Sequence, residues 1–275
     1  MSRSGVASEV YDQFLSLCEG AGPERCALAG GRHTAAERFK RLSKRLKRAP
    51  IPAPAVQPPL SSTQKLTYGD MIVSQNVAVA EPDTWPENAA NVAAALRGNG
   101  SGLEGVAAAF QAPASWAKTM VASAITCADA PAKRSLSAWP QVIRRFKNAS
   151  RLKGNFLGWG AWAPCAAWPV RGEDNYRGPW TVTTPNPILL ISQRYDPNTG
   201  YANAVHVEQL LGNAVLLTQE GYGHPAANDP SMCVDEAMTA YLVDLITPPP
   251  GTVCQSDHLP FDPEFGQWGR EGDLS

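Results

Sequence analysis

The 275-residue chain has 24 basic and 25 acidic residues, a net charge of −1, and an apolar content of 44%. This length and apolar content suffice for a globular core and exclude disorder along the whole chain. The balanced charge gives no support for nucleic acid or an anionic membrane as the main partner. No apolar run approaches the about 18 residues of a transmembrane helix, and the N-terminal residues lack the apolar region of a secretory signal.

Six cysteines indicate an oxidising compartment. The simplest pairing is sequential, and each bond would then close a local loop: Cys18–Cys26, Cys127–Cys165 and Cys233–Cys254. None of the six has the CxxC spacing of a metal site, and we expect neither a metal nor a cofactor. Buried free thiols in a cytosolic protein are the alternative, but an even count within Pro- and Gly-rich connections favours disulfides.

Most of the first 160 residues have helical patterns. A short amphipathic helix is predicted over 6–18, and a second over 34–48, where Thr34 and Glu37 have the spacing of a capping box. The proline-rich residues 49–59 should form an extended connector, because proline lacks the amide donor. Further patterns cover 66–79 (helix or mixed structure), 87–97, 116–127 (helix or strand) and 139–153.

Two of these segments could bind a partner, but a structural interpretation is favoured for both. The helix over 34–48 surrounds a narrow apolar stripe with basic residues, which could meet a membrane or nucleic acid; the near-zero net charge favours a solvated face. Residues 158–169 contain three tryptophans around Cys165. They could stack against a ligand, but aromatic side chains also pack well around a disulfide.

The stretch 184–224 contains the clearest chemistry. An apolar strand over 187–193 precedes Asp196, and a second over 214–218 precedes His224, with a helical pattern between them. Parallel strands of such a unit end at one sheet edge, where open α/β sheets place their sites. The acid could orient the imidazole, whose other nitrogen would take a proton from a serine. Alternatively, Asp196 only forms an Asp-Pro-Asn turn and His224 is a loop residue without a role.

The chain closes with a predicted helix over 233–246, a Pro-rich stop, and Cys254 returning toward Cys233. We therefore expect three parts. They are a mostly helical region over 6–160, an α/β region over 161–255 and a tail over 256–275.

Several segments resemble a known family. TPNPILLISQRYDPNTGYANA, VLLTQEGYGH and CVDEAMTAYLVDLITPPPGTVC, with CEGAGPERCAL and AITCAD earlier, are similar to the C-terminal region of secreted tripeptidyl-aminopeptidase-like serine hydrolases. The resemblance implies an α/β-hydrolase fold with a helical cap, the three sequential disulfides, and Asp196 and His224 as orienting acid and general base. It also implies cleavage of short peptides from free N-termini. Asn198-Thr199-Gly200 departs from the commoner Val-Thr-Pro but keeps the Asp-Pro-x-Thr frame.

The nucleophile of that family is missing. It lies in a Gly-x-Ser-x-Gly elbow, and the chain contains no such pentapeptide. Ser101 stands among glycines, but Asn99 occupies the second position before it, and Ser4 fails the same test. The oxyanion loop, the earlier strands and the export signal are also absent. We therefore expect a partial α/β-hydrolase, extracellular in its family, that would act on a peptide substrate only with a nucleophile half supplied.

Two other hypotheses stay open. The chain could be a non-catalytic module that binds a peptide or small ligand on a vestigial hydrolase scaffold, or a separate partner chain could supply the nucleophile. Upstream DNA encoding a signal peptide and a Gly-x-Ser-x-Gly strand would favour the partial enzyme. Two parallel strands without neighbours leave open edges, so the chain alone should be marginally stable or prone to aggregation.

Overall fold

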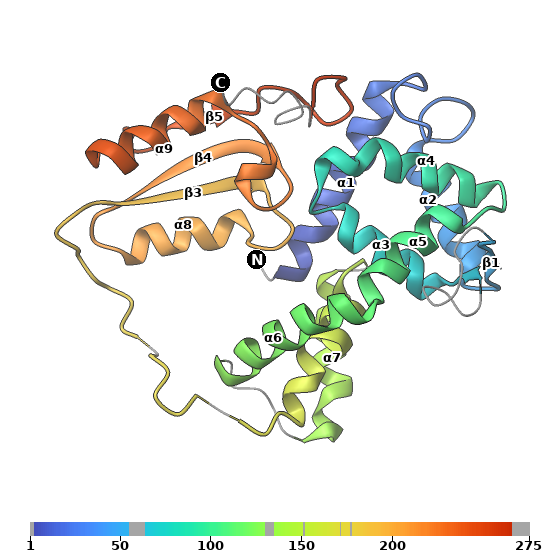
Figure 1. Ribbon diagram of the computed structural model, residues 1–275, viewed down its shortest axis with the longest axis horizontal. Helices are drawn as coiled ribbons and strands as arrows, with labels where there is room; N and C mark the ends of the chain where they lie inside the picture. Colours follow the sequence, from blue (N-terminus) through green and yellow to red (C-terminus); the bar gives the residue numbers. More distant parts are fainter. Residues whose placement is uncertain are drawn as a thin grey trace. The chain divides into compact units, whose positions relative to one another are not determined.

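The computed structural model, drawn as a ribbon in Figure 1, describes residues 3–54, 64–129, 135–150, 152–170, 172–176 and 178–265. The chain divides into two compact units. The first unit comprises Met1–Leu17, Val79–Trp85 and Arg177–Ser275, and the second comprises Cys18–Ala78 and Pro86–Tyr176. Two short segments from the N-terminal part of the sequence therefore group with the C-terminal α/β region.

Helices make up most of the second unit. They are α2 (Ala35–Leu46), α3 (Tyr68–Ala78), α4 (Trp85–Leu96), α5 (Ser101–Gln111), α6 (Pro113–Asp129) and α7 (Trp139–Ala149), and α1 (Arg3–Ala21) begins in the first unit. The short strands β1 (Ile51–Pro52) and β2 (Lys65–Leu66) pair antiparallel. A π-helical segment, Phe156–Trp162, and a 3-10 turn, Ala163–Ala166, follow α7.

Side-chain caps explain where two of these helices begin. The Thr34 hydroxyl accepts the backbone N–H of Glu37 at 3.2 Å, and the Glu37 carboxylate accepts the backbone N–H of Thr34 at 3.1 Å. The predicted capping box is therefore confirmed. Thr67 and Asp70 make the same reciprocal bonds before α3, at 3.2 and 3.0 Å.

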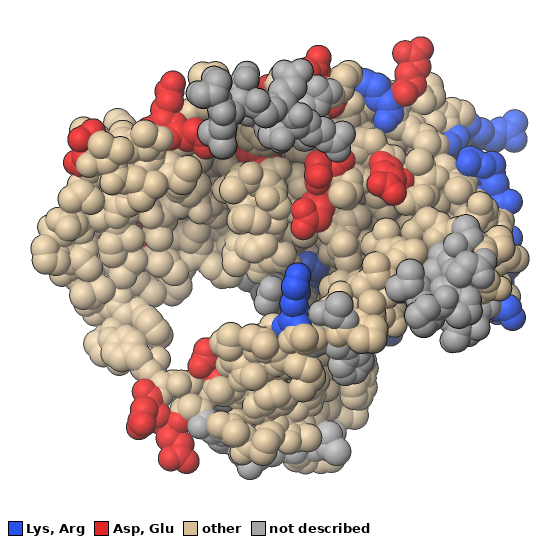
Figure 2. All heavy atoms as spheres, viewed as in Figure 1, with Lys and Arg blue, Asp and Glu red and all other residues tan. Residues whose placement is uncertain are grey.

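The basic side chains of α2 lie on the outside of its unit (Figure 2). Leu42 and Leu46, which form the apolar stripe of α2, are buried. The stripe is therefore used in the packing of this unit and is not free to enter a lipid surface. This arrangement matches the solvated-face interpretation of the helix.

Two parts of the second unit differ from the sequence expectations. Helix α5 was not predicted, because its Gly- and Ala-rich sequence lacks a clear apolar face. The proline-rich connector contains β1, whose partner β2 follows the connector; residues 55–63 of the connector lie outside the described part. Of the clustered tryptophans, Trp162 packs against the buried Trp139 and Ile143, whereas Trp159 is 55% exposed.

The first unit is built on a parallel three-stranded sheet with the order β3-β4-β5. Its strands are β3 (Ile188–Tyr195), β4 (Ala214–Tyr222) and β5 (Val253–Gln255), connected by α8 (Tyr201–Leu210) and α9 (Met232–Asp244). Helices α8 and α9 lie on opposite faces of the sheet (Figure 1). The expected two strands are thus joined by a third, β5, which is too short to give a recognisable alternation.

Two clusters form the core of this unit. Leu217, Val234 and Cys254 are buried between the sheet and α9. An aromatic cluster, Phe14, Trp85, Tyr222 and Phe261, joins α1, the 79–85 segment, the end of β4 and the C-terminal loop. The Trp85 ring is fully buried and lies 5.4 Å from Phe14 and 5.7 Å from Tyr222, both edge-to-face.

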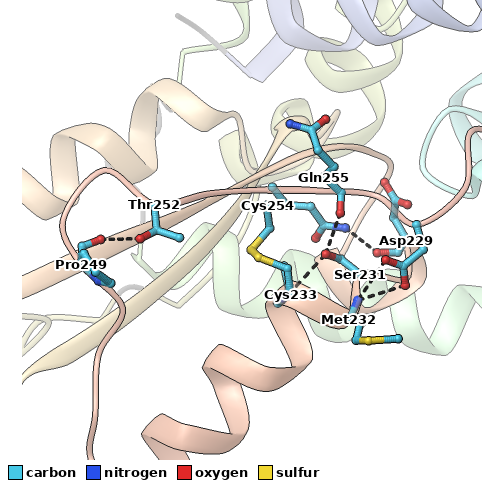
Figure 3. The surroundings of a disulfide bond; sticks show 11 residues. Asp229, Ser231, Met232, Cys233, Pro249, Thr252, Cys254 and Gln255 are labelled. Atoms are coloured by element: carbon cyan, nitrogen blue, oxygen red, sulfur yellow. Dashed lines mark hydrogen bonds between the residues drawn. A yellow bond between two sulfur atoms is a disulfide. The ribbon is translucent and has the colours of Figure 1, made fainter.

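All three predicted disulfides are confirmed: Cys18–Cys26, Cys127–Cys165 and Cys233–Cys254. Figure 3 shows Cys233, at the start of α9, bonded to Cys254 of β5. The bond holds the last helix against the edge strand of the sheet. Among the described residues, no helix is long and apolar enough to cross a membrane.

Replacing Cys233 and Cys254 together with alanine is expected to lower the free energy of unfolding by about 3 kcal/mol. The bond spans 21 residues, so its loss frees more unfolded-chain entropy than loss of Cys18–Cys26, which spans 8. Urea denaturation of both double-alanine variants measures the difference. An equal or smaller loss for the Cys233–Cys254 variant would contradict this expectation.

Candidate active site

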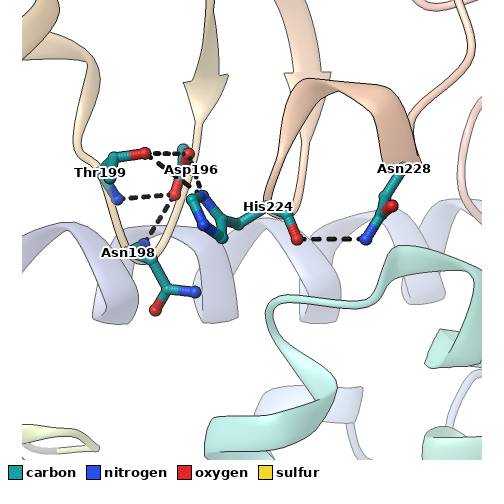
Figure 4. A network of polar contacts seen from close by, with 5 residues as sticks. All are labelled: Asp196, Asn198, Thr199, His224 and Asn228. Carbon is teal, nitrogen blue, oxygen red and sulfur yellow. Dashed lines mark hydrogen bonds and ion pairs between the residues drawn. The ribbon is translucent and has the colours of Figure 1, made fainter. Parts of the chain in front are cut away.

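Asp196 directly follows β3 and is held by a tight turn (Figure 4). Its Oδ1 accepts the backbone N–H groups of Asn198 at 2.7 Å and Thr199 at 2.8 Å, while Oδ2 accepts the Thr199 hydroxyl at 2.5 Å. Only 4% of the residue is exposed. These bonds are those of an Asx turn, so the turn-forming interpretation of Asp196 describes real contacts.

His224 follows the end of β4 and reaches back to the same carboxylate. Its Nδ1 lies 2.8 Å from Asp196 Oδ2, and its side chain is 34% exposed. The strand register brings the two loops together, because Tyr195 and Tyr222 at the strand ends are paired. With Nδ1 bonded to the acid, Nε2 is the nitrogen left for a reacting group. Asp196 therefore forms the turn and also holds the imidazole.

The position of His224 also depends on Gly223 and the 79–85 segment. Gly223 has φ +94°, and a Cβ there would lie 2.9 Å from the Ala80 carbonyl oxygen and 2.5 Å from Pro82 Cδ. The His224 N–H donates to that Ala80 carbonyl at 2.9 Å. Only glycine fits this backbone conformation and this close approach without strain.

Thr199 is a functional candidate to which the sequence assigned no role beyond its place in the Asp-Pro-x-Thr frame. Its hydroxyl lies 3.2 Å from His224 Nδ1 as well as 2.5 Å from Asp196 Oδ2. The hydroxyl therefore fixes the acid in the rotamer that meets the ring.

Hydrogen bonds keep Asp196 charged despite its burial. Burial alone would raise the pKa of the carboxyl, but the Thr199 hydroxyl, His224 and the backbone N–H groups of Thr199 and Asn198 outweigh this and lower it. An ionised acid facing Nδ1 favours the tautomer with the proton on Nδ1. The imidazole is thereby prepared to accept a proton at Nε2.

A second buried acid, Asp229, closes the histidine loop. Its Oδ2 accepts the Tyr222 N–H at 2.6 Å and the Ser256 hydroxyl at 2.8 Å, and its carbonyl oxygen accepts the Gln219 side-chain amide. The other carboxylate oxygen is buried and has no hydrogen-bond partner among the described residues. Burial raises the pKa of Asp229 to about 6, despite the hydrogen bonds that lower it. The sequence reading missed this residue, for which the Asp-Pro turn was the only signal.

Asp229 is expected to make the protein less stable as the pH rises from about 4 to about 6. In that window the folded state holds a proton on Asp229 that the unfolded state has lost, which costs up to about 3 kcal/mol above pH 6. Asp229→Asn cannot ionise, so relative to wild type it should gain that amount between pH 4 and 7. Denaturant melts across this range measure it, with the exposed Asp174→Asn as control; a pH-independent difference would contradict the assignment.

The remaining sequence candidates lie elsewhere. Ser101 is the first residue of α5 in the second unit, and it follows a loop rather than a strand. A nucleophile elbow needs a strand before the serine, so Ser101 lacks that setting. His206 is in α8, and His33 lies 3.5 Å from Glu37. Among the described residues, only His224 pairs with a buried acid.

A family model described as TAP-like protein matches residues 150–254. This stretch is a TAP-like domain of the α/β-hydrolase type. The TAP-like domain includes β3, β4, α8, α9, Asp196 and His224. The predicted fold class, a mixed helix-and-sheet chain containing part of an α/β-hydrolase, is confirmed.

Curated hydrolases share weak similarity over a longer part of the chain. Carboxylesterase B of Mycobacterium tuberculosis is 29% identical over 218 residues, 73% of this chain and 40% of that protein. Serine protease Hip1 of the same species is 29% identical over 198 residues, covering 69% and 37%. Tripeptidyl aminopeptidase of Streptomyces lividans is 29% identical over 133 residues, covering 45% and 23%. The chain spans about two fifths of the first of these relatives and less of the others.

Proposed function

We propose that this chain supplies the acid and the base of a Ser-Asp-His triad in a serine hydrolase that cleaves short peptides from free N-termini. The observation that supports this most is the 2.8 Å contact between Asp196 Oδ2 and His224 Nδ1 at the carboxyl ends of adjacent parallel strands. The serine lies in a nucleophile half that this sequence does not contain. Alone, the chain is proposed to be inactive.

The roles follow from the chemistry of the pair. A serine hydroxyl attacks the scissile carbonyl carbon, and His224 Nε2 takes the hydroxyl proton and later gives it to the leaving amine. Asp196 stays ionised, holds the ring in the required tautomer and stabilises the imidazolium. The relatives named as a serine protease and a tripeptidyl aminopeptidase support this reaction class.

The open edge of β3 supports a missing half. This strand has a neighbour only on the β4 side, and its apolar residues 188–191 are partly exposed. Gln193 is 1% exposed, yet neither atom of its side-chain amide has a partner among the described residues. Buried amide atoms without partners are costly, and a further strand at this edge would cover the apolar residues. We propose that the nucleophile half packs here.

Secretion and the cap belong to the same proposal. Three disulfides support an oxidising, extracellular location. Residues 6–160 are proposed to supply the helical cap over the peptide-binding pocket, and 161–255 the sheet portion.

The proposal is tested by assaying the purified chain with aminopeptidase and ester substrates and with a fluorophosphonate that labels active serines. Neither turnover nor labelling is expected, because His224 has no nucleophile to activate. Robust turnover that a serine-directed inhibitor abolishes would disprove inactivity. If the DNA upstream encodes a Gly-x-Ser-x-Gly strand, the longer protein should be active, and His224→Gln should abolish that activity.

The second candidate function is a non-catalytic module that binds a peptide or small ligand. The half-exposed Trp159 beside a buried tryptophan cluster favours it, since an exposed indole can stack against a ligand. In that case Trp159→Ala would abolish ligand binding, and no upstream nucleophile would be found.

A further inference from the structure

Glu81 lies beside the proposed base although more than 140 positions separate them in the sequence. It belongs to the 79–85 segment, which is part of the same unit as His224. The preceding residue, Ala80, accepts the His224 backbone N–H at 2.9 Å, and the following residue, Pro82, is buried against Gly223. Glu81 is therefore held by ordered contacts on both sides.

Asn228 connects Glu81 to His224 directly. Its side-chain amide donates to Glu81 Oε2 at 3.3 Å and to the His224 carbonyl oxygen at 3.1 Å. Figure 4 shows Asn228 turned toward the backbone of His224. The carboxylate of Glu81 is therefore about two hydrogen bonds from the residue proposed to act on the scissile carbonyl.

The carboxylate of Glu81 has no cation to balance it. Among the residues that the structure describes, no Lys, Arg or His forms an ion pair with Glu81, and its side chain is partly buried. Burial raises the pKa of Glu81, Asp83 raises it further and His224 lowers it. A partly desolvated carboxylate next to a second acid gains most from a bound cation.

We propose that Glu81 binds the free α-ammonium group of the peptide substrate. This inference rests on the proposed function and identifies the feature of the substrate that the site selects. An ammonium group provides three N–H donors and a positive charge, and Glu81 provides a carboxylate that is only weakly engaged by Asn228. Because the anchor lies so close to His224, only a few residues fit between the ammonium group and the cleaved bond. Short products follow.

A binding experiment tests this without requiring turnover. The chain is titrated with tri-alanine and with N-acetyl-tri-alanine, and the ring signals of His224, assigned with His224→Gln, are followed by NMR. The free peptide should bind about tenfold more tightly than the acetylated one, as expected for one charge-assisted hydrogen bond. Glu81→Gln, which keeps the shape and the Asn228 contact, should remove that preference. Asp83→Asn, an exposed acid two residues away, should keep it.

Each other outcome overturns the inference. Equal affinity of the two peptides, a preference that survives in Glu81→Gln, or no shift with either peptide would each do so. Tight binding of N-acetyl-Ala-Ala-Lys would assign Glu81 to a side-chain cation instead of the N-terminus. The proposed triad is judged separately, by the serine-directed labelling and turnover of the longer protein, so its failure is distinguishable from failure at Glu81.

Discussion

Asp196→Asn is expected to lower the turnover of a complete hydrolase containing this chain by about 10⁴-fold. Asparagine keeps the size and much of the turn, but its amide can donate to Nδ1 where the carboxylate only accepts. His224 would then move its proton to Nε2 and could no longer act as the base. The same change is measurable in the present chain, since ¹⁵N NMR of the imidazole distinguishes the two tautomers.

The matched control for this variant is Asp244→Asn, which changes an exposed acid near the end of α9. It should alter neither the tautomer nor the turnover. An Asp196→Asn protein with an unchanged His224 tautomer would mean that the acid does not control the ring, and the proposed roles of both residues would fail.

Trp85→Ala is expected to lower the free energy of unfolding by about 3–5 kcal/mol, the range for removing a large buried aromatic side chain. Trp85 is fully buried and contacts the rings of Phe14, Tyr222 and Phe261. Because Tyr222 ends the strand that leads to His224, the cavity should also loosen the histidine loop. Urea denaturation measures the loss, and the His224 ring signal reports the loop.

Trp180→Ala provides the control, because Trp180 belongs to the same unit but is 56% exposed. Its replacement should cost well under 1 kcal/mol. A loss for Trp85→Ala no larger than that would show that the aromatic cluster does not hold the first unit together.

Local patterns predicted the elements whose signals lie within a few residues. The capping box of Thr34 and Glu37 depends on a spacing of three, and the apolar runs of β3 and β4 are continuous and end at polar breaks. Helix α5 was missed because its alanines and glycines define no buried face, and β5 because three residues define no alternation. Cys254 was nevertheless placed near Cys233, since only a short loop separates them in sequence.

The rest of the site depends on contacts between distant segments. The bond from His224 to Ala80, the bridge from Asn228 to Glu81 and the bond from Ser256 to Asp229 each join residues that no periodic pattern relates. Their partners are chosen by the packing of the first unit, in which Trp85 meets Tyr222. Long-range pairing of this kind is set by the whole fold.

The sequence alone determined that an acid and a histidine stand at the ends of consecutive strands, and that no Gly-x-Ser-x-Gly accompanies them. It could do so because strand period, turn residues and motifs are local properties. Only the tertiary structure decided that Asp196 and His224 lie 2.8 Å apart, that Thr199 fixes the acid, and that Glu81 lies beside them. Those facts depend on strand register and on segments brought together by a shared core.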